Sequence, residues 1–207
     1  MRSYTAALFL EDLAHERLVR SLVDRLANES GLSVTCRVFN ARGGHGKTLS
    51  ELKQFLNDLQ KGVATGSPDI VIVAIDANCK GINKRRKEIL EHIPDVFANI
   101  TACAIPDPHI ERWVLLDSAA FKAALGEGCK APDKKCDKER YKVLLANAVQ
   151  EAGVAPILGG LEHADSIVAN MNINAVTAND KSFKHFIDEL RVQFNRLKTR
   201  EISKTTD

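Results

Sequence analysis

The sequence predicts an α/β protein in which a mostly parallel, Rossmann-like sheet is flanked by helices and followed by a C-terminal helical extension. Up to about residue 105, apolar strand-like segments alternate with segments of helical periodicity. These strands lack the apolar and polar alternation of a half-exposed sheet, which favours parallel pairing under helices on both faces. Beyond that point the pattern changes to helices and loops. A chain of 207 residues suits one sizeable core, so we expect residues 1–115 to form the α/β core and residues 116–207 to pack on it.

Four segments are expected to be strands. The clearest is residues 69–76 (DIVIVAID), which are continuous, rich in β-branched residues and preceded by Pro68. The others are residues 5–10, 32–39 and 100–105. Because a helical segment separates each strand from the next, the order along the chain is typical of crossover connections between parallel strands.

Helical periodicity fills the intervals between the strands. Residues 13–28 repeat leucine and valine at helical spacing, a second helix ends near Gly62, and a basic helix precedes Pro94. Further on, Asp107-Pro108 has the pattern of an N-cap followed by proline at the first helical position, and predicts a helix through residues 110–115. The remaining helices are expected around residues 141–149 and over residues 183–197, with a frayed polar tail after Lys198.

The composition limits the possible functions. The chain is 44% hydrophobic and 27% charged, with 29 Lys and Arg against 27 Asp and Glu, which excludes wholesale disorder and does not indicate a strongly basic nucleic-acid binder. No apolar run approaches the ~18 residues of a membrane span, and the apolar stretch near the N-terminus is too short for a signal peptide. We therefore expect a soluble, cytoplasmic protein without a membrane partner.

The cysteines are odd in number and widely spaced. None forms a Cys-x-x-Cys pair, the spacing that a structural zinc site would favour. We therefore expect reduced thiols rather than a disulfide framework at Cys36, Cys79, Cys103, Cys129 and Cys136.

Polar side chains follow the predicted strands. In an open parallel sheet, ligands bind at the carboxyl ends of the strands. Glu11 follows the first strand and Asp76 ends the third, and such carboxylates are the ligands that Mg²⁺ prefers. Simpler roles stay open, because Asp12 and Asp107 could be helix N-caps and Asp76 could close an Asx-turn.

Two basic segments could meet phosphates. Residues 84–87 (KRRK) follow the third strand closely, although such a run is usually a solvated helix face. Residues 129–142 hold several lysines among acidic residues, so a solvated helix start is the simpler interpretation there.

Gly46-Lys47-Thr48 looks like the end of a phosphate-binding P-loop. That motif needs its first glycine at the position of Ala41 and should follow the first strand of its unit, whereas this segment follows the second strand. A nucleotide-binding protein is therefore the weakest alternative. Lys47 remains a candidate phosphate contact near a helix N-terminus.

Residues 10–16 (LEDLAHE) and 71–78 (VIVAIDAN) resemble the Toprim domain that is shared by topoisomerases, bacterial primases, RecR-type repair proteins and nucleases of the overcoming-lysogenization-defect family. In that family a glutamate ends the first strand and an Asp-x-Asp motif ends the third, and together they bind Mg²⁺ for phosphodiester chemistry. The resemblance covers roughly residues 5–115. It is closest to small stand-alone Toprim-like proteins of prokaryotic defence and mobile loci, in which a segment like residues 106–113 (PDPHIERW) follows the fourth strand.

The resemblance implies roles for individual residues. Glu11 would be the general acid/base or a metal ligand, and Asp76 would be the first aspartate ligand. Asn78 stands where the family has its second aspartate, and its lack of charge weakens the hold on Mg²⁺. Glu111 or Asp107 could restore the missing negative charge.

The resemblance therefore implies a Mg²⁺- or Mn²⁺-dependent nuclease acting on DNA or RNA, as an effector of a prokaryotic anti-phage defence system with an ATPase partner. Because of Asn78, the alternative is a catalytically weak, Toprim-like binding or regulatory subunit of an ATPase complex. The expected catalytic residues are Glu11, Asp76 and Lys47; the expected metal ligands are Glu11, Glu16, Asp76, Asn78 and Glu111; the expected nucleic-acid contacts are Lys80, Lys84, Arg85, Arg112, Lys134 and Lys135.

Overall fold

Four parallel strands form the sheet of this α/β protein. The computed structural model describes residues 3–40, 43–137 and 139–205. Within them the strand order is β2-β1-β3-β4 and every neighbouring pair is parallel. The strands are β1 (Ser3–Leu10), β2 (Ser33–Asn40), β3 (Ile70–Ala74) and β4 (Thr101–Ala104). The predicted α/β fold with a parallel sheet is confirmed.

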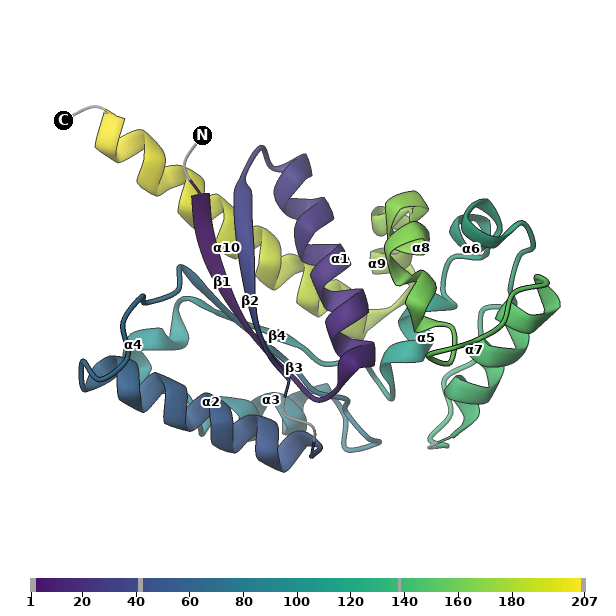
Figure 1. Cartoon of the computed structure of the whole chain (residues 1–207), viewed down its shortest axis with the longest axis horizontal. Helices are drawn as coiled ribbons and strands as arrows, with labels where there is room; N and C mark the ends of the chain where they lie inside the picture. The colour runs from purple at the N-terminus through teal and green to yellow at the C-terminus, as the bar shows by residue number, and fades with distance from the viewer. Residues whose placement is uncertain (1–2, 41–42, 138, 206–207) are drawn as a thin grey trace.

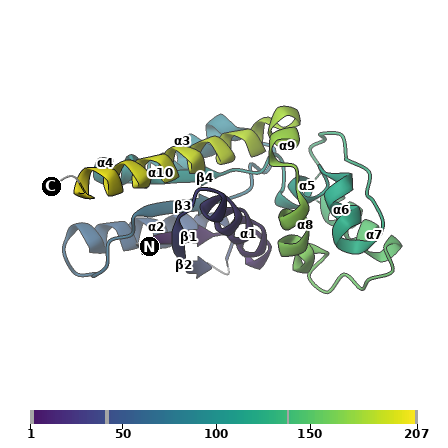
Figure 2. The same ribbon diagram turned by 90° about the horizontal axis from the view of Figure 1, so that it is seen from above.

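Alternate residues of each strand face opposite sides of the sheet, and both sides are covered. In β1, Ala6, Leu8 and Leu10 enter one hydrophobic core, whereas Ala7 and Phe9 enter the other. Figures 1 and 2 show helices on both faces of the sheet. The first core includes α1 (Leu13–Glu29) and α10 (Lys181–Thr205), and the second includes α2 (His45–Gln60), α3 (Ile82–Leu90) and α4 (Asp95–Ala98).

Asp12 and Asp107 were both predicted to be helix N-caps. Asp12 is the N-cap of α1, and its carboxylate accepts a hydrogen bond from the backbone N–H of His15, as the capping interpretation predicted. The N-cap predicted at Asp107 is wrong. The Asp107–Pro108 bond is cis, and α5 (Ile110–Val114) starts later with His109 at its N-cap, so the Asp107 side chain is free to form an ion pair with Lys134 instead.

The second half of the chain adds helices beyond α1, at the right of Figure 1, before α10 returns along the sheet. Leu197 of α10 is buried and its carbonyl accepts a hydrogen bond from Tyr4. The helix continues from there to Thr205, which corrects the prediction of a frayed tail after Lys198. The added elements are α6 (Ser118–Leu125), α7 (Arg140–Glu151), the 3-10 helix η1 (Leu161–His163), α8 (Ala164–Asn170) and α9 (Ile173–Asn179).

One hydrophobic core joins the two halves of the chain. It contains the inner residues of β1 and β3 together with residues of α5, α6 and α10. Trp113 of α5 stacks on Phe186 of α10 with ring centroids 5.9 Å apart and meets Phe183 edge-on at 5.3 Å. Of the second half of the chain, α10 therefore packs directly on the sheet against β4, whereas α8 packs on α1 and α7 packs on α5. No helix in the described ranges is long and apolar enough to cross a membrane.

Candidate metal centre

The carboxyl ends of β1 and β3 bring Glu11 and Asp76 together. The two strands are neighbours, and Glu11 follows β1 directly while Asp76 lies two residues beyond β3. The backbone N–H of Asp76 donates a hydrogen bond to Oε2 of Glu11 at 3.2 Å, and the N–H of Glu11 donates to the carbonyl of Ala74. The sheet register thus fixes the meeting of these two acidic residues.

His15, in the first turn of α1, connects two carboxylates. Its Nδ1 lies 2.7 Å from Oδ1 of Asp12, and its Nε2 lies 3.1 Å from Oδ1 of Asp76. Because Asp12 also caps the helix, one aspartate fixes both the start of α1 and the orientation of the imidazole. His15 is 1% exposed, so these carboxylates replace the water it loses on burial.

A second histidine holds the other oxygen of Asp76. Nδ1 of His109, in the loop after β4, lies 2.9 Å from Oδ2 of Asp76. The Asp76 side chain, 12% exposed, therefore lies between two imidazoles. Within the part of the chain that the structure describes, Nε2 of His109 is buried and has no hydrogen-bond partner.

The electrostatics of this network favour charged forms. Burial alone would raise the pKa of Asp76, but the charge of His15 and hydrogen bonds from both histidines hold it below its usual value. Burial alone would lower the pKa of His15, but the charge of Asp76 and hydrogen bonds to Asp12 and Asp76 raise it well above its usual value. For Asp12, burial again opposes ionisation, and the interactions with His15 lower the pKa to about 2.

Glu111 lies near this network, but its pKa is shifted in the opposite direction to that of Asp76. Burial, and secondly the charge of Asp76, raises its pKa. The side chain lines a hollow of about 360 Å³ together with Lys142, and its Oε2 has no hydrogen-bond partner among the described residues. His109 differs, because its hydrogen bond to Asp76 raises its pKa more than burial lowers it.

Among the described residues, Glu11, His15 and Asp76 form a group that could hold a metal ion, since their potential ligand atoms all lie within 4.8 Å of one another. Glu16 and Glu111 are outside this group. Glu16 instead lines a hollow along α1 with Arg17, Arg20, Asp24 and Asp165. The structure therefore does not bring Glu16, which was predicted as a ligand, into this group, because its position on α1 places it along that other hollow.

Asn78 occupies an unusual backbone conformation. Its φ is +45° and that of Cys79 is +65°, so two consecutive residues without glycine's freedom adopt the left-handed region. The N–H of Asn78 donates to the carbonyl of Pro108 at 3.2 Å, and the N–H of Ala77 donates to that of Pro106 at 2.8 Å. The loop after β3 is thereby joined to the loop after β4.

Two arginines predicted to contact nucleic acid are buried instead. Arg85 is 0% exposed. Its Nε donates a hydrogen bond to the backbone carbonyl of Asp76 at 2.9 Å and so holds the loop after β3 in place. Arg112 is 7% exposed and forms an ion pair with Asp180, which joins α5 to the start of α10. The prediction is wrong for both, because neither guanidinium is accessible to a phosphate.

The lysines of the prediction remain accessible at the surface. Lys47, in the first turn of α2, and Lys80, in the loop after β3, form exposed ion pairs with Glu51 at 3.9 Å and Glu88 at 3.2 Å. The other lysines of the prediction are exposed too: Lys84 on α3, Lys134, which pairs with Asp107, and Lys135, which pairs with Asp133.

The segment that resembles a P-loop does not provide the hydroxyl of such a loop. Thr48 is buried, and its hydroxyl lies 3.3 Å from the carbonyl of Gly44 and 3.4 Å from that of Leu10, to which it can donate. That hydroxyl is therefore used inside the protein, whereas a P-loop hydroxyl binds Mg²⁺. The N-terminus of α2 nevertheless adjoins the centre, because a Cβ built on Gly44 would lie 4.0 Å from Oε1 of Glu11.

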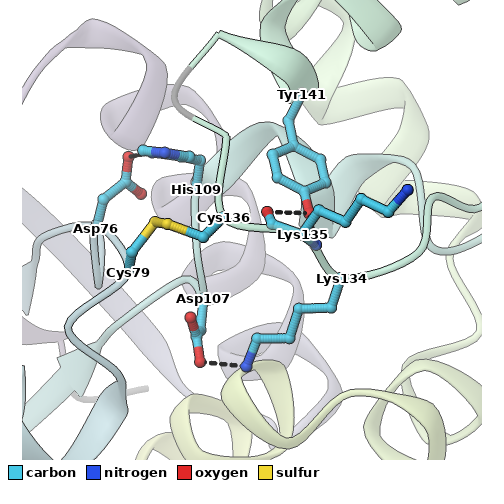
Figure 3. The surroundings of a disulfide bond; sticks show 8 residues. All are labelled: Asp76, Cys79, Asp107, His109, Lys134, Lys135, Cys136 and Tyr141. Atoms are coloured by element: carbon cyan, nitrogen blue, oxygen red, sulfur yellow. Dashed lines mark hydrogen bonds and ion pairs between the residues drawn. A yellow bond between two sulfur atoms is a disulfide. The ribbon is translucent and has the colours of Figure 1, made fainter.

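A disulfide between Cys79 and Cys136 borders the centre (Figure 3). The prediction of reduced thiols is therefore wrong for these two residues and correct for Cys36, Cys103 and Cys129. The two cysteines are separated by 57 positions, and folding brings their Cα atoms to 5.5 Å. Their spacing along the chain carries no sign of this pairing, because it depends on how the segment of residues 126–137 packs.

Sequence reasoning missed the two histidines that hold Asp76. His15 had an available signal, since it lies three residues after a predicted N-cap and so in the helical turn nearest the sheet edge. His109 had a weaker one, its position just after the fourth strand.

Comparison of the chain with protein-family models, with curated proteins and with solved structures finds no match.

Proposed function

We propose that this protein is a divalent-metal-dependent phosphodiesterase that cleaves nucleic acid. The observation that carries the proposal is the meeting of Glu11, His15 and Asp76 at the carboxyl edge of a parallel sheet. Glu11 and Asp76 occupy the strand ends at which the resembled Toprim domain has its acidic ligands. The lowered pKa of Asp76 and the raised pKa of His15 are also typical of functional sites.

The donor set suits a divalent cation. Two carboxylates provide the oxygen ligands that Mg²⁺ and Mn²⁺ favour, and one imidazole nitrogen is tolerated better by Mn²⁺ than by Mg²⁺. His15 has the support that metal-binding histidines usually have, because its other ring nitrogen already meets the Asp12 carboxylate at 2.7 Å. His15 would have to release the proton at Nε2 before that atom became a ligand.

The protein's own groups would divide the work of cleavage. When bound, the cation would polarise the phosphoryl group and offset the negative charge of the transition state. Glu11, half-buried beside the N-terminus of α2, would orient the attacking water. Lys47 and Lys80 would bind phosphate oxygens at the rim, and His109 would keep Asp76 in place through the proton at Nδ1.

A binding or regulatory module is the second candidate, and one observation favours it. Both carboxylate oxygens of Asp76 already meet an imidazole, His15 or His109. The two histidines can therefore balance the charge of Asp76 without a cation. The wider setting is proposed on the resemblance alone: a cytoplasmic effector of anti-phage defence that works with an ATPase partner on DNA or RNA.

Metal binding and cleavage can be tested together with matched variants. We expect Mn²⁺ to bind the wild type, seen by electron paramagnetic resonance, and to support cleavage of a labelled oligonucleotide. Asp76→Asn should abolish both, and Asp12→Asn should weaken Mn²⁺ binding about 10- to 100-fold by releasing His15. Glu16→Gln is the control, since it removes a neighbouring carboxylate outside the centre. Equal binding and cleavage by folded Asp76→Asn would disprove the proposal.

A further inference from the structure

The disulfide joins two loops that meet only in the folded protein. Cys79 lies in the loop after β3, three residues beyond Asp76, and Cys136 lies in the segment of residues 126–137 that precedes α7. Figure 3 shows this bond together with Asp76 and His109. The link thus connects the loop of the metal centre to a segment that contributes no ligand to it.

The same segment is also tied to the loop that carries His109. Lys134 forms an ion pair with Asp107, two residues before His109. The hydroxyl of Tyr141 accepts from the N–H of Lys135 at 2.7 Å, and the Tyr141 ring lies 6.3 Å from the ring of His109. The segment therefore contacts both loops that position Asp76, the loop after β3 through Cys136 and the loop after β4 through Lys134.

Apart from these ties the segment is weakly held. Cys129 is buried in the larger core at the start of the segment and Pro132 is buried, but residues 130–131 and 133–137 are exposed. Its ion pairs, such as Lys135 with Asp133 at 3.3 Å, lie at the surface and contribute little to stability. A stretch with few buried contacts opens readily once a covalent restraint is removed.

Cys79 and Cys136 are also the accessible cysteines, since both are exposed. The other three are half-buried or buried, and burial raises the pKa of the Cys36 and Cys129 thiols to about 11 and that of Cys103 to about 12. Because the thiolate is the reactive form, those three are poor partners for exchange.

We propose that Cys79 and Cys136 form a reversible thiol–disulfide site, whose disulfide closes the 126–137 segment against the metal centre and whose reduction by a dithiol protein or small dithiol opens it. The opened state gives a phosphodiester access to Asp76, which is 9% exposed in the closed state. The regulation of cleavage by this site rests on the proposed function. The opening of the segment on reduction is independent of it.

The exchange balances with a dithiol as the reductant. One thiolate of the dithiol attacks Sγ of Cys136, the Cys79–Cys136 bond breaks, and Cys79 leaves as a thiolate. The second thiolate of the reductant then attacks the reductant sulfur that is bonded to Cys136, and Cys136 leaves as a thiolate. The reductant ends as a disulfide, and two electrons and two protons have passed to the two cysteines.

Hydrogen–deuterium exchange on the full chain tests the opening directly. Alkylation after denaturation should count three free thiols before treatment with dithiothreitol and all five after it. Backbone amides of residues 130–137 should then exchange at least about tenfold faster, while those of β3 stay unchanged. Equal exchange of the segment in the two states, with the thiol count confirmed, would overturn the proposal.

Oligonucleotide cleavage separates this proposal from the proposed function. Oxidised protein should cleave more slowly than reduced protein, and Cys136→Ser should match the reduced protein with or without dithiothreitol. Cys36→Ser is the control and should keep the redox response, because it leaves the disulfide intact. Equal cleavage in both redox states overturns the regulation. Absence of cleavage in both states disproves the proposed function, and the exchange experiment still decides the opening.

Discussion

The buried carboxylate of Asp180 illustrates how single residues fasten the C-terminal helices to the sheet. It accepts hydrogen bonds from the hydroxyl of Ser182 at 2.5 Å and from the N–H of Phe183 at 2.8 Å, and it pairs with Arg112. Burial alone would raise the pKa of Asp180, but these partners lower it below its usual value. Ionised Asp180 therefore stabilises the fold at neutral pH.

Asp180→Asn should destabilise the protein at pH 7 by about 3–5 kcal/mol, because it leaves the buried Arg112 without its counter-charge. A depressed pKa contributes stability above the unfolded-state value of about 3.9 and loses it as the pH falls through the folded-state value. The free energy of unfolding of the variant should therefore fall less steeply than that of the wild type as the pH is lowered. Urea denaturation from pH 3 to 7 measures both effects. Asp188→Asn, which breaks an exposed pair with Lys184, should change stability by less than about 1 kcal/mol.

Individual site residues were predictable where the backbone direction alone decides their place. Glu11 and Asp76 follow neighbouring parallel strands, so any such sheet brings them to one edge. Arg85 and Arg112 were mispredicted because the sequence does not reveal which basic side chain of a helix points inward. The inward position follows from packing against the loop of Asp76 and against α10.

At the scale of elements, the junction between α7 and η1 depends on Gly160. Its φ is +99°, and a Cβ there would lie 2.8 Å from Cγ2 of Val149 and 2.9 Å from Cγ of Leu145. Both side chains are buried in the larger core. The turn can approach α7 this closely only because the residue has no side chain.

Gly160→Ala should destabilise the protein by about 2–4 kcal/mol, through backbone strain and overpacking against α7. Gly62→Ala is a matched control, since Gly62 also has positive φ but a Cβ there would meet no atom within 4 Å. That variant should cost only the strain, about 1–2 kcal/mol. Thermal denaturation followed by circular dichroism compares them, and equal losses would show that packing at Gly160 is not tight.

For the whole molecule, one shared core buries side chains from both halves of the chain, so we expect the two halves to unfold together. The face of the sheet that α1 and α10 cover contributes to the same core as α5, α6 and α8. Phe186 of α10 is fully buried and stacks on Trp113, which lies in the predicted α/β core. Loss of either half would expose the apolar side chains of the other.

Phe186→Ala should therefore destabilise the entire protein by about 3–5 kcal/mol, the usual cost of removing a buried aromatic ring. Fluorescence of Trp113 and far-ultraviolet circular dichroism should report one coincident urea transition. Val192→Ala, an exposed change on the same helix, should leave stability within about 0.5 kcal/mol. Separate transitions for the two probes would indicate that the helical extension unfolds independently.

The sequence by itself determined the order of strands and helices in the α/β half, the parallel sheet and the meeting of Glu11 with Asp76. These features depend on local periodicity and on the chemistry of strand ends, which a single chain segment carries. Only the tertiary structure decided that His15 and His109 hold Asp76, that Arg85 and Arg112 are buried, and that Cys79 bonds to Cys136. Each of these depends on side chains from segments far apart in sequence. Their contact is set by how helices and loops pack on the sheet, and no local pattern encodes that packing.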